Sequence, residues 1–588
     1  MADIILKGIS VSLGIGIGTV GFMNTKALAL PHSLIPHTAV ESEVARLQAA
    51  VQKVIDHYES TLNNLPEHLQ EHGDIIDSHL LICNDKKLLG EAERLIRTQL
   101  YCAEWALEES INLIKALFQQ INAPYIRERM QDVRIVGEAI SKALLSIADA
   151  LIPDACILFA NDIGAADILG LASKNIAGVI TAEGGSPAHT GIITRGLGIP
   201  AIVGVGGFPA VVEPGDLIIL DGFSGQILIR PSEVDLEKAR IKEQEYTTFK
   251  NACLHNAHYP AESVDGERIR VFANIDVFSD SSLVHDNGGE GIGLVRTEMG
   301  FLSRRELPTE EELFIDYHAI VQAMAPHEVT FRTIDFGADK QFGAMPIFEE
   351  ANPALGLRST RFSLHHQHLF KTQLRALVRA SAFGKISIMF PLIGSVKELK
   401  AALSLLHEAK QEVANEGYAF ADIAVGTMVE LPSAVIIADS LVKLVDFFSI
   451  GTNDLIQFTL GVDRDNKRVA HLYRSLHPAI IRSIKHVADI ANAAGVPVSV
   501  CGEMAADPYC IPLLLAMPID TLSVSPRDIP LIKYIIRNCS LQQCRKILGD
   551  ALMARDADVN QRMMYEYAYH AYPQTIPFLG SVPTGNIL

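Results

Sequence analysis

A histidine shortly after a pair of glycines is the strongest candidate in this chain for covalent chemistry. His189 lies in the segment 184–204, GGSPAHTGIITRGLGIPAIVG, between two glycines and a stretch that begins like an amphipathic helix. Paired glycines let the backbone approach a bulky anion, a helix start offers free N–H groups, and a neutral imidazole can attack phosphorus. These features suggest that His189 carries a phosphoryl group. A histidine in a glycine-rich turn is, by itself, more often an ordinary surface residue.

A second group of chemically useful side chains lies at the ends of predicted strands beyond residue 260. Glu430 and Asp454 are expected at the ends of neighbouring strands, where two carboxylates can share one Mg²⁺ while substrate oxygens and water complete an octahedron. Three arginines accompany them: Arg296 and Arg332 end the second and third predicted strands, and Arg464 lies in the loop after the sixth. Guanidinium groups bind phosphate and carboxylate bidentately, so the set predicts a site for a small compound that bears both groups.

Cys501 adds a possible proton donor to this group. It lies in VSVCGEMAAD at the end of the seventh predicted strand, and Asn453 lies at the end of the sixth. A thiol with an ordinary pKa of about 8.5 is mostly protonated at neutral pH and can protonate a carbanion or enolate. From the residues alone, a role as a small buried hydrophobic residue stays equally open.

The elements that must position these side chains are strands alternating with helical stretches. Eight strand candidates follow residue 260: RIRVFANI, GIGLVRTE, EVTFRTID, SIMFPLI, AVGTMVEL, DFFSIGTNDLI, VPVSVCGE and TLSVSP. Alternation of this kind predicts parallel pairing through crossover helices. Eight such units in about 300 residues fit a (β/α)8 barrel, whose active site forms at the C-terminal ends of the strands.

The N-terminal half has a different organisation. Residues 35–147 carry apolar stripes at helical spacing and predict a bundle of four helices, inserted into an α/β domain made of residues 1–34 and 148–231 that contains His189. Residues 232–260 begin with a possible N-cap pattern and predict a polar linker helix. With a barrel over residues 261–575, the chain is expected to be a multidomain α/β protein.

Composition limits the classes of binding partner and the cellular compartment that we expect for this protein. The net charge of −19 argues against nucleic acid or an anionic membrane as the main partner, because both favour a basic face. The start of the chain has no basic leader, and no stretch reaches about 18 uninterrupted apolar residues. Eight cysteines without CxxC spacing predict free thiols. We therefore expect a cytoplasmic protein.

The motifs of the barrel resemble one known family. GIGLVRTEMGF, LPTEEE, FRTIDFGADK, ANPALGLR, VGTMVELPSA, FFSIGTNDLIQFTLGVDR and VCGEMAADP resemble segments of enzyme I of the bacterial phosphotransferase system, the phosphoenolpyruvate-protein phosphotransferases. The resemblance runs over nearly the whole chain. It implies that His189 is phosphorylated and that Cys501 protonates the enolate. It also implies that Arg296, Arg332, Asn453, Asp454 and Arg464 bind phosphoenolpyruvate, while Glu430 and Asp454 hold Mg²⁺.

The same resemblance implies partners and motion. The phosphoryl group would pass from His189 to a small HPr-like phosphocarrier protein docked on the helical bundle, as the first step of sugar uptake. A swivel about the linker and a homodimer formed through the barrel are further expectations. Two departures concern the site: Pro187-Ala188 replace the usual Thr-Ser before the histidine, and Asp276 replaces a usual glycine.

Three alternatives stay open at this point. A regulatory-branch enzyme or weakly active signalling protein would bind the carrier yet transfer poorly. A Mg²⁺-dependent lyase barrel acting on pyruvate would not need His189 or the inserted bundle. A dikinase would need an additional ATP-binding domain, for which the chain has neither length nor motif.

Overall fold

In the computed structural model the chain consists of two compact units, and the boundary between them in the sequence falls between Thr248 and Phe249. Pro577 and Phe578 belong to the first unit. The structure describes residues 4–23, 30–63, 73–119, 124–147, 155–161, 163, 175–182, 191, 194–195, 197–276, 278, 280–302, 306–336, 352–464, 466 and 468–579.

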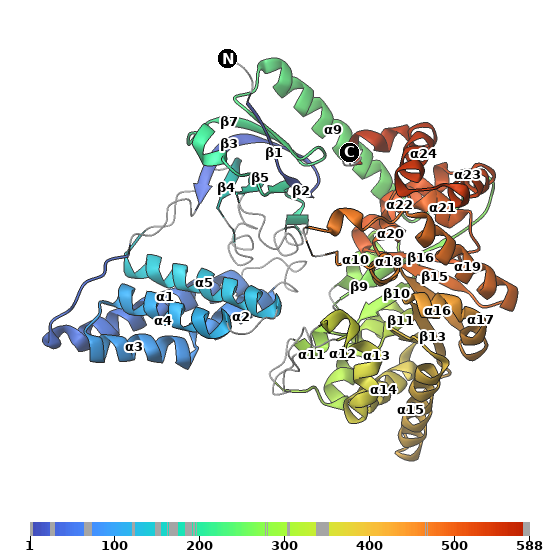
Figure 1. The fold of residues 1–588 in the computed structure, drawn as a ribbon, viewed down its shortest axis with the longest axis horizontal. Helices are drawn as coiled ribbons and strands as arrows, with labels where there is room; N and C mark the ends of the chain where they lie inside the picture. Colours follow the sequence, from blue (N-terminus) through green and yellow to red (C-terminus); the bar gives the residue numbers. More distant parts are fainter. Residues whose placement is uncertain are drawn as a thin grey trace. The chain divides into compact units, whose positions relative to one another are not determined.

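The second unit is a closed barrel (Figure 1), and its described residues include eight strands that all run parallel. The strands are β9 (Arg270–Ile275), β10 (Ile292–Arg296), β11 (Val329–Arg332), β12 (Ile386–Phe390), β13 (Ala424–Val429), β14 (Phe447–Gly451), β15 (Val498–Cys501) and β16 (Thr521–Val524). All eight predicted strands are confirmed. Strands such as β12 are buried along their whole length, because side chains fill the barrel on one face and helices cover the other.

Helices connect the strands and surround the barrel in Figure 1. The longer ones are α10 (Asp280–Asp286), α12 (Glu310–Met324), α13 (Ser359–His365), α14 (Gln367–Ala380), α15 (Val396–Asn415), α18 (Thr452–Leu460), α19 (Pro478–Ala494), α22 (Ile529–Asn538), α23 (Leu541–Met553) and α24 (Ala557–Ala571). Short helices lie at α11 (Met299–Leu302), α16 (Pro432–Ile436), α17 (Ala438–Leu441), α20 (Glu503–Ala506) and α21 (Ile511–Leu515). The start of α12 is fixed by a capping box between Thr309 and Glu312.

The first unit contains a sheet in which eight strands of the described residues follow the order β1-β8-β7-β3-β4-β5-β6-β2. Their bounds are β1 (Ile4–Lys7), β2 (Ile9–Ser12), β3 (Ile15–Met23), β4 (Cys156–Ala160), β5 (Ile176–Thr181), β6 (Ala201–Val203), β7 (Leu217–Asp221) and β8 (Gln226–Ile229), with the short helix α8 (Phe208–Val211) before β7. Strands β3 and β4 are parallel neighbours although more than a hundred residues separate them. The intervening helices are therefore an insertion between two adjacent strands.

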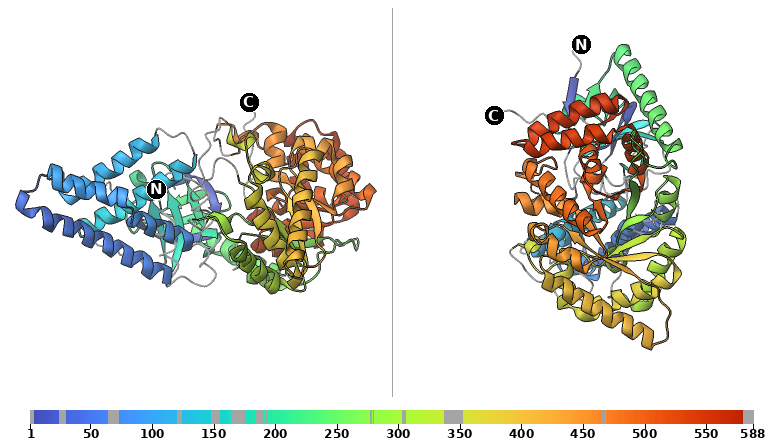
Figure 2. Two further views of the ribbon diagram at one scale, coloured as in Figure 1. Left: turned by 90° about the horizontal axis from the view of Figure 1, so that it is seen from below. Right: turned by 90° about the vertical axis from the view of Figure 1, so that its right-hand side faces the viewer.

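The inserted bundle differs from the prediction in the number of its helices. Its described residues form five: α1 (Val40–Asn63), α2 (Gly73–Cys83), α3 (Lys86–Gln99), α4 (Ala103–Gln119) and α5 (Pro124–Leu144). Figure 2 shows these blue helices running alongside one another. The additional helix arises because the Asp85 carboxylate accepts the backbone N–H groups of Lys87 and Leu88 and starts α3 directly after α2.

A long helix, α9 (Glu233–His255), follows the sheet, and the boundary between the two units falls within it. The part of α9 before this boundary is held by the sheet domain, since Lys242 forms a 2.8 Å ion pair with Asp221 and Tyr246 packs on Phe223 and Phe578. Among the helices that the structure describes, none is both long and apolar enough to span a membrane.

Candidate functional site

The C-terminal ends of the barrel strands bring most of the predicted side chains together. Arg296 ends β10, Arg332 ends β11, Glu430 directly follows β13, and Cys501 ends β15. Because all strands of the barrel are parallel, these residues lie at the same end.

The prediction for the sixth strand was wrong at its end. Strand β14 stops at Gly451, and Asn453 and Asp454 lie in the first turn of α18. The side-chain oxygen of Asn453 accepts the backbone N–H of Glu503 at 2.9 Å. The backbone carbonyl of Asn453 accepts the hydroxyl of Tyr473 at 3.1 Å. The loops after β14 and β15 are thus tied to each other by Asn453.

Arg332 is buried and held by two carboxylates. Its Nη2 donates to Oε1 of Glu298 at 2.8 Å, and its Nη1 lies 2.9 Å from Oδ2 of Asp335. Burial opposes its charge, but Glu298 and Asp335 outweigh that effect and raise the pKa of Arg332. Within the described part of the chain, its Nε is buried without a hydrogen-bond partner. An N–H in this state is expected where a bound anion completes the site.

Arg358 is a member of the site that sequence reasoning missed. It precedes α13, and its Nη2 donates to Oδ1 of Asp335 and to Oδ2 of Asp454, each at 3.1 Å. The signal available in the sequence was the motif ANPALGLR, which ends on this arginine. Burial raises the pKa of Asp335, but Arg332 and Arg358 outweigh it and lower that pKa to about 2.

Glu430 is almost fully buried among like charges. Burial, and then the negative charges of Asp454 and Asp335, raise its pKa well above the ordinary value. Its Oε1 accepts the backbone N–H of Leu392 at 2.5 Å. Leu392 has a φ of 51°, a conformation that costs a leucine about 1–3 kcal/mol, so strained backbone holds this carboxylate.

Glu430 and Asp454 provide carboxylate oxygens, which are ligands that suit a magnesium ion. Glu430 and Asp454 repel each other, and a divalent cation bound between them removes that repulsion. No group of three or more His, Cys, Asp or Glu residues within the described ranges is arranged to hold a metal. Two protein carboxylates would leave the remaining positions to substrate oxygens and water, which Mg²⁺ commonly retains.

Cys501 lies inside the barrel rim in a small apolar environment. Its side chain packs with Leu294, Met389 and Met428, and its Sγ lies 3.1 Å from the hydroxyl of Ser449. Burial raises the pKa of Cys501, while the contact with Ser449 lowers it. At neutral pH the thiol is therefore protonated and can act as an acid.

The other two arginines are exposed. Arg464 lies in the turn after α18 and contacts the hydroxyl of Tyr473. Arg296 forms an ion pair with Asp276, whose Oδ1 lies 3.2 Å from its Nη1. His189, by contrast, lies outside the residues that the structure describes, so its surroundings are not part of this geometry.

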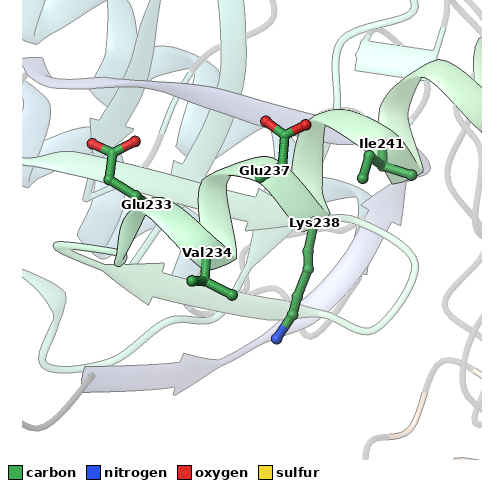
Figure 3. Close-up of a pocket in the computed structure, with 5 residues that line it drawn as sticks. All are labelled: Glu233, Val234, Glu237, Lys238 and Ile241. Carbon is green, nitrogen blue, oxygen red and sulfur yellow. The ribbon is translucent and has the colours of Figure 1, made fainter.

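A surface hollow of about 350 Å³ lies elsewhere, along the first half of α9 (Figure 3). Its lining residues are Glu233, Val234, Glu237, Lys238 and Ile241. None of the predicted site residues lines this hollow, so the barrel end remains the candidate site.

Known protein families match segments in both units of the chain. Three family models match: "PEP-utilising enzyme, N-terminal" over residues 7–129, "PEP-utilising enzyme, mobile domain" over 152–225, and "PEP-utilising enzyme, PEP-binding domain" over 251–541. The chain is 38% identical over 558 residues to the phosphoenolpyruvate-protein phosphotransferase of Geobacillus stearothermophilus, covering 94% of this chain and 96% of that protein. The Cupriavidus necator protein of that name is 38% identical over 571 residues (94% and 97%), and the Bacillus subtilis protein is 37% identical over 543 (92% and 95%).

Proposed function

The chain belongs to the family of phosphoenolpyruvate-protein phosphotransferases, and on that premise we propose how its own residues carry the reaction. The protein is a transferase that moves a phosphoryl group from phosphoenolpyruvate to protein. The observation that supports the assignment of residues is the meeting of three groups at one end of the barrel. These are Arg332, whose buried Nε has no hydrogen-bond partner among the residues that the structure describes, the carboxylates Glu430 and Asp454, and the thiol of Cys501.

Phosphoenolpyruvate binds at the strand ends through Arg332, Arg296 and Arg464, with Asn453 and Asp454 beside it. Guanidinium groups match the phosphate and carboxylate oxygens of such a compound. Because the net charge of the protein is −19, these local arginines must supply the attraction that the protein as a whole does not. Glu298 and Asp335 hold Arg332 in place before substrate arrives.

Glu430 and Asp454 would hold the magnesium ion. When bound, Mg²⁺ would supply positive charge that stabilises the transferring phosphoryl group. Arg358 donates to Asp454 and Asp335 and thereby orients Asp454, one of the two carboxylates that would hold the ion.

The chemical step joins phosphorus to His189. Its Nε2 forms a bond to phosphorus as the bond from phosphorus to the enol oxygen breaks, and the electron pair of the broken bond stays on that oxygen. Cys501 then gives its proton to the terminal carbon of the enolate. Pyruvate leaves, and the thiolate of Cys501 must regain a proton before the next turnover.

Phosphohistidine then passes the group to a histidine of an HPr-like phosphocarrier protein. The carrier docks on the inserted bundle, and a swivel at the linker lets His189 serve both sites. Two copies of the chain form a homodimer through the barrel. The cytoplasm remains the proposed compartment because all eight cysteines are free thiols, the state that a reducing compartment maintains.

Incubation with ³²P-labelled phosphoenolpyruvate and Mg²⁺ tests the proposal. The wild type should acquire an acid-labile label, and His189→Ala should acquire none; label on that variant contradicts the assigned acceptor. Cys501→Ala should still fold and accept one phosphoryl group, while pyruvate release slows by roughly a hundredfold or more. The lyase alternative is not favoured, because the chain matches family models for the N-terminal segment and the mobile domain as well as the one for the barrel.

A further inference from the structure

The ion pair between Arg296 and Asp276 is built into the barrel register. Val295 pairs with Ile275, so the two charged residues are the next residues along the neighbouring strand ends of β10 and β9. Nη1 of Arg296 donates to both carboxylate oxygens of Asp276, at 3.2 and 3.4 Å. The carboxylate thus occupies one nitrogen of a guanidinium group that the proposed reaction uses to bind substrate.

This pair differs from the other arginine pairs of the site in its exposure. The side chains of Arg332 and Glu298 are 12% and 8% exposed, whereas those of Arg296 and Asp276 are 45% and 51% exposed. A buried pair is costly to separate, while an exposed pair contributes little and exchanges readily. Arg332 is therefore held in one place, but Arg296 can release Asp276 when an anion that it binds more strongly is present.

We infer that Asp276 is an internal competitor that sets the affinity for phosphoenolpyruvate through Arg296. The inference rests on the proposed function of the same site. In the free protein the Asp276 carboxylate occupies Arg296, and substrate must displace it. This competition weakens binding and raises KM, and it does not act on the bond that breaks, so kcat is left unchanged.

Steady-state kinetics with phosphoenolpyruvate tests this inference on the full-length protein. Asp276→Asn keeps the shape of the side chain and removes its charge. We expect the KM for phosphoenolpyruvate to fall roughly three- to fivefold with kcat unchanged. Asp489→Asn is the matched control, because Asp489 is an exposed carboxylate paired with Lys485 on α19 and its loss changes the net charge equally. That control should leave KM as in the wild type.

A double-mutant cycle separates action through Arg296 from a general change in charge. In an Arg296→Ala background, Asp276→Asn should change KM much less than in the wild type. An unchanged or raised KM in Asp276→Asn, or an equal fall in both backgrounds, overturns the inference. A wild-type protein that takes no label from phosphoenolpyruvate instead refutes the proposed function, and the inference falls with it; label on the wild type with no change of KM refutes the inference alone.

Discussion

The hydroxyl oxygen of Ser449 lies 3.1 Å from Sγ of Cys501, across the neighbouring barrel strands β14 and β15. Both side chains are buried, so water does not replace this contact easily. When Cys501 has given up its proton, the Ser449 hydroxyl is placed to donate to the thiolate. Ser449 is thus a positioning residue for the proposed acid of the reaction.

Ser449→Ala should lower kcat about fivefold with little change in KM, since one hydrogen bond to the thiolate is lost. The contact lowers the pKa of Cys501, so its removal raises that pKa further. Only the protonated thiol is active, and activity is lost as pH rises through its pKa. The alkaline limb of the rate profile should therefore move to higher pH in the variant.

Ser499→Ala serves as the control for that measurement. Ser499 lies on β15, and its hydroxyl donates to the carbonyl of Phe448 at 3.4 Å rather than to Cys501. Its kinetics and pH profile should match the wild type. A raised KM with unchanged kcat in Ser449→Ala would show that the hydroxyl serves binding instead.

Glu430→Gln should raise the Mg²⁺ concentration that gives half-maximal labelling by at least about tenfold, because one of two anionic ligands becomes neutral. Removal of Mg²⁺ with a chelator should stop labelling of the wild type, and added Mg²⁺ should restore it. Glu408→Gln provides the control, because Glu408 is an exposed carboxylate that pairs with Lys371 on the outer helices. An unchanged Mg²⁺ requirement in Glu430→Gln would remove Glu430 from the metal site.

Asp335→Asn should lower the free energy of unfolding of the barrel at pH 6 by about 2 kcal/mol. The pKa of Asp335 is about 2 in the folded protein, below its ordinary value of 3.8. A lowered pKa gives stability that is fully present above pH 4 and is lost as pH falls toward 2. Calorimetric unfolding of both proteins at several pH values between 6 and 2 should therefore show the difference shrinking below pH 4; a constant difference contradicts the assigned cause.

Lys533→Met should destabilise the barrel by about 3 kcal/mol without changing kcat. The ammonium group of Lys533 is buried on α22 and donates to the carbonyls of Ala257, Tyr259 and Gly288, at 3.0, 3.4 and 2.7 Å. Methionine fills the space but leaves these carbonyls unpaired. Chemical denaturation measures the free energy of unfolding, and steady-state kinetics measures kcat. A variant as stable as the wild type would show that water replaces the ammonium group.

The kind and order of most elements could be predicted from the sequence pattern. Eight buried strands of the barrel were recognisable from short apolar runs separated by helical stretches, and Arg296, Arg332 and Cys501 were placed correctly because each directly ends such a run. The end of the sixth strand was misjudged, since β14 passes directly into α18 and the apolar Leu455 and Ile456 continue the run beyond the strand. An apolar run does not by itself distinguish a buried strand from the first turn of a buried helix.

Which charged side chains meet depends on how the barrel folds. Arg358 lies 96 residues before Asp454 in the chain, and the closed barrel brings their side chains within 3.1 Å. The partnership of Asp276 with Arg296 depends in the same way on the register of β9 against β10. Spacing along a chain predicts which face or end of an element carries a side chain, because that depends on local geometry. Ion pairs and pKa values depend on distances and burial between elements, and these exist only after the barrel has closed.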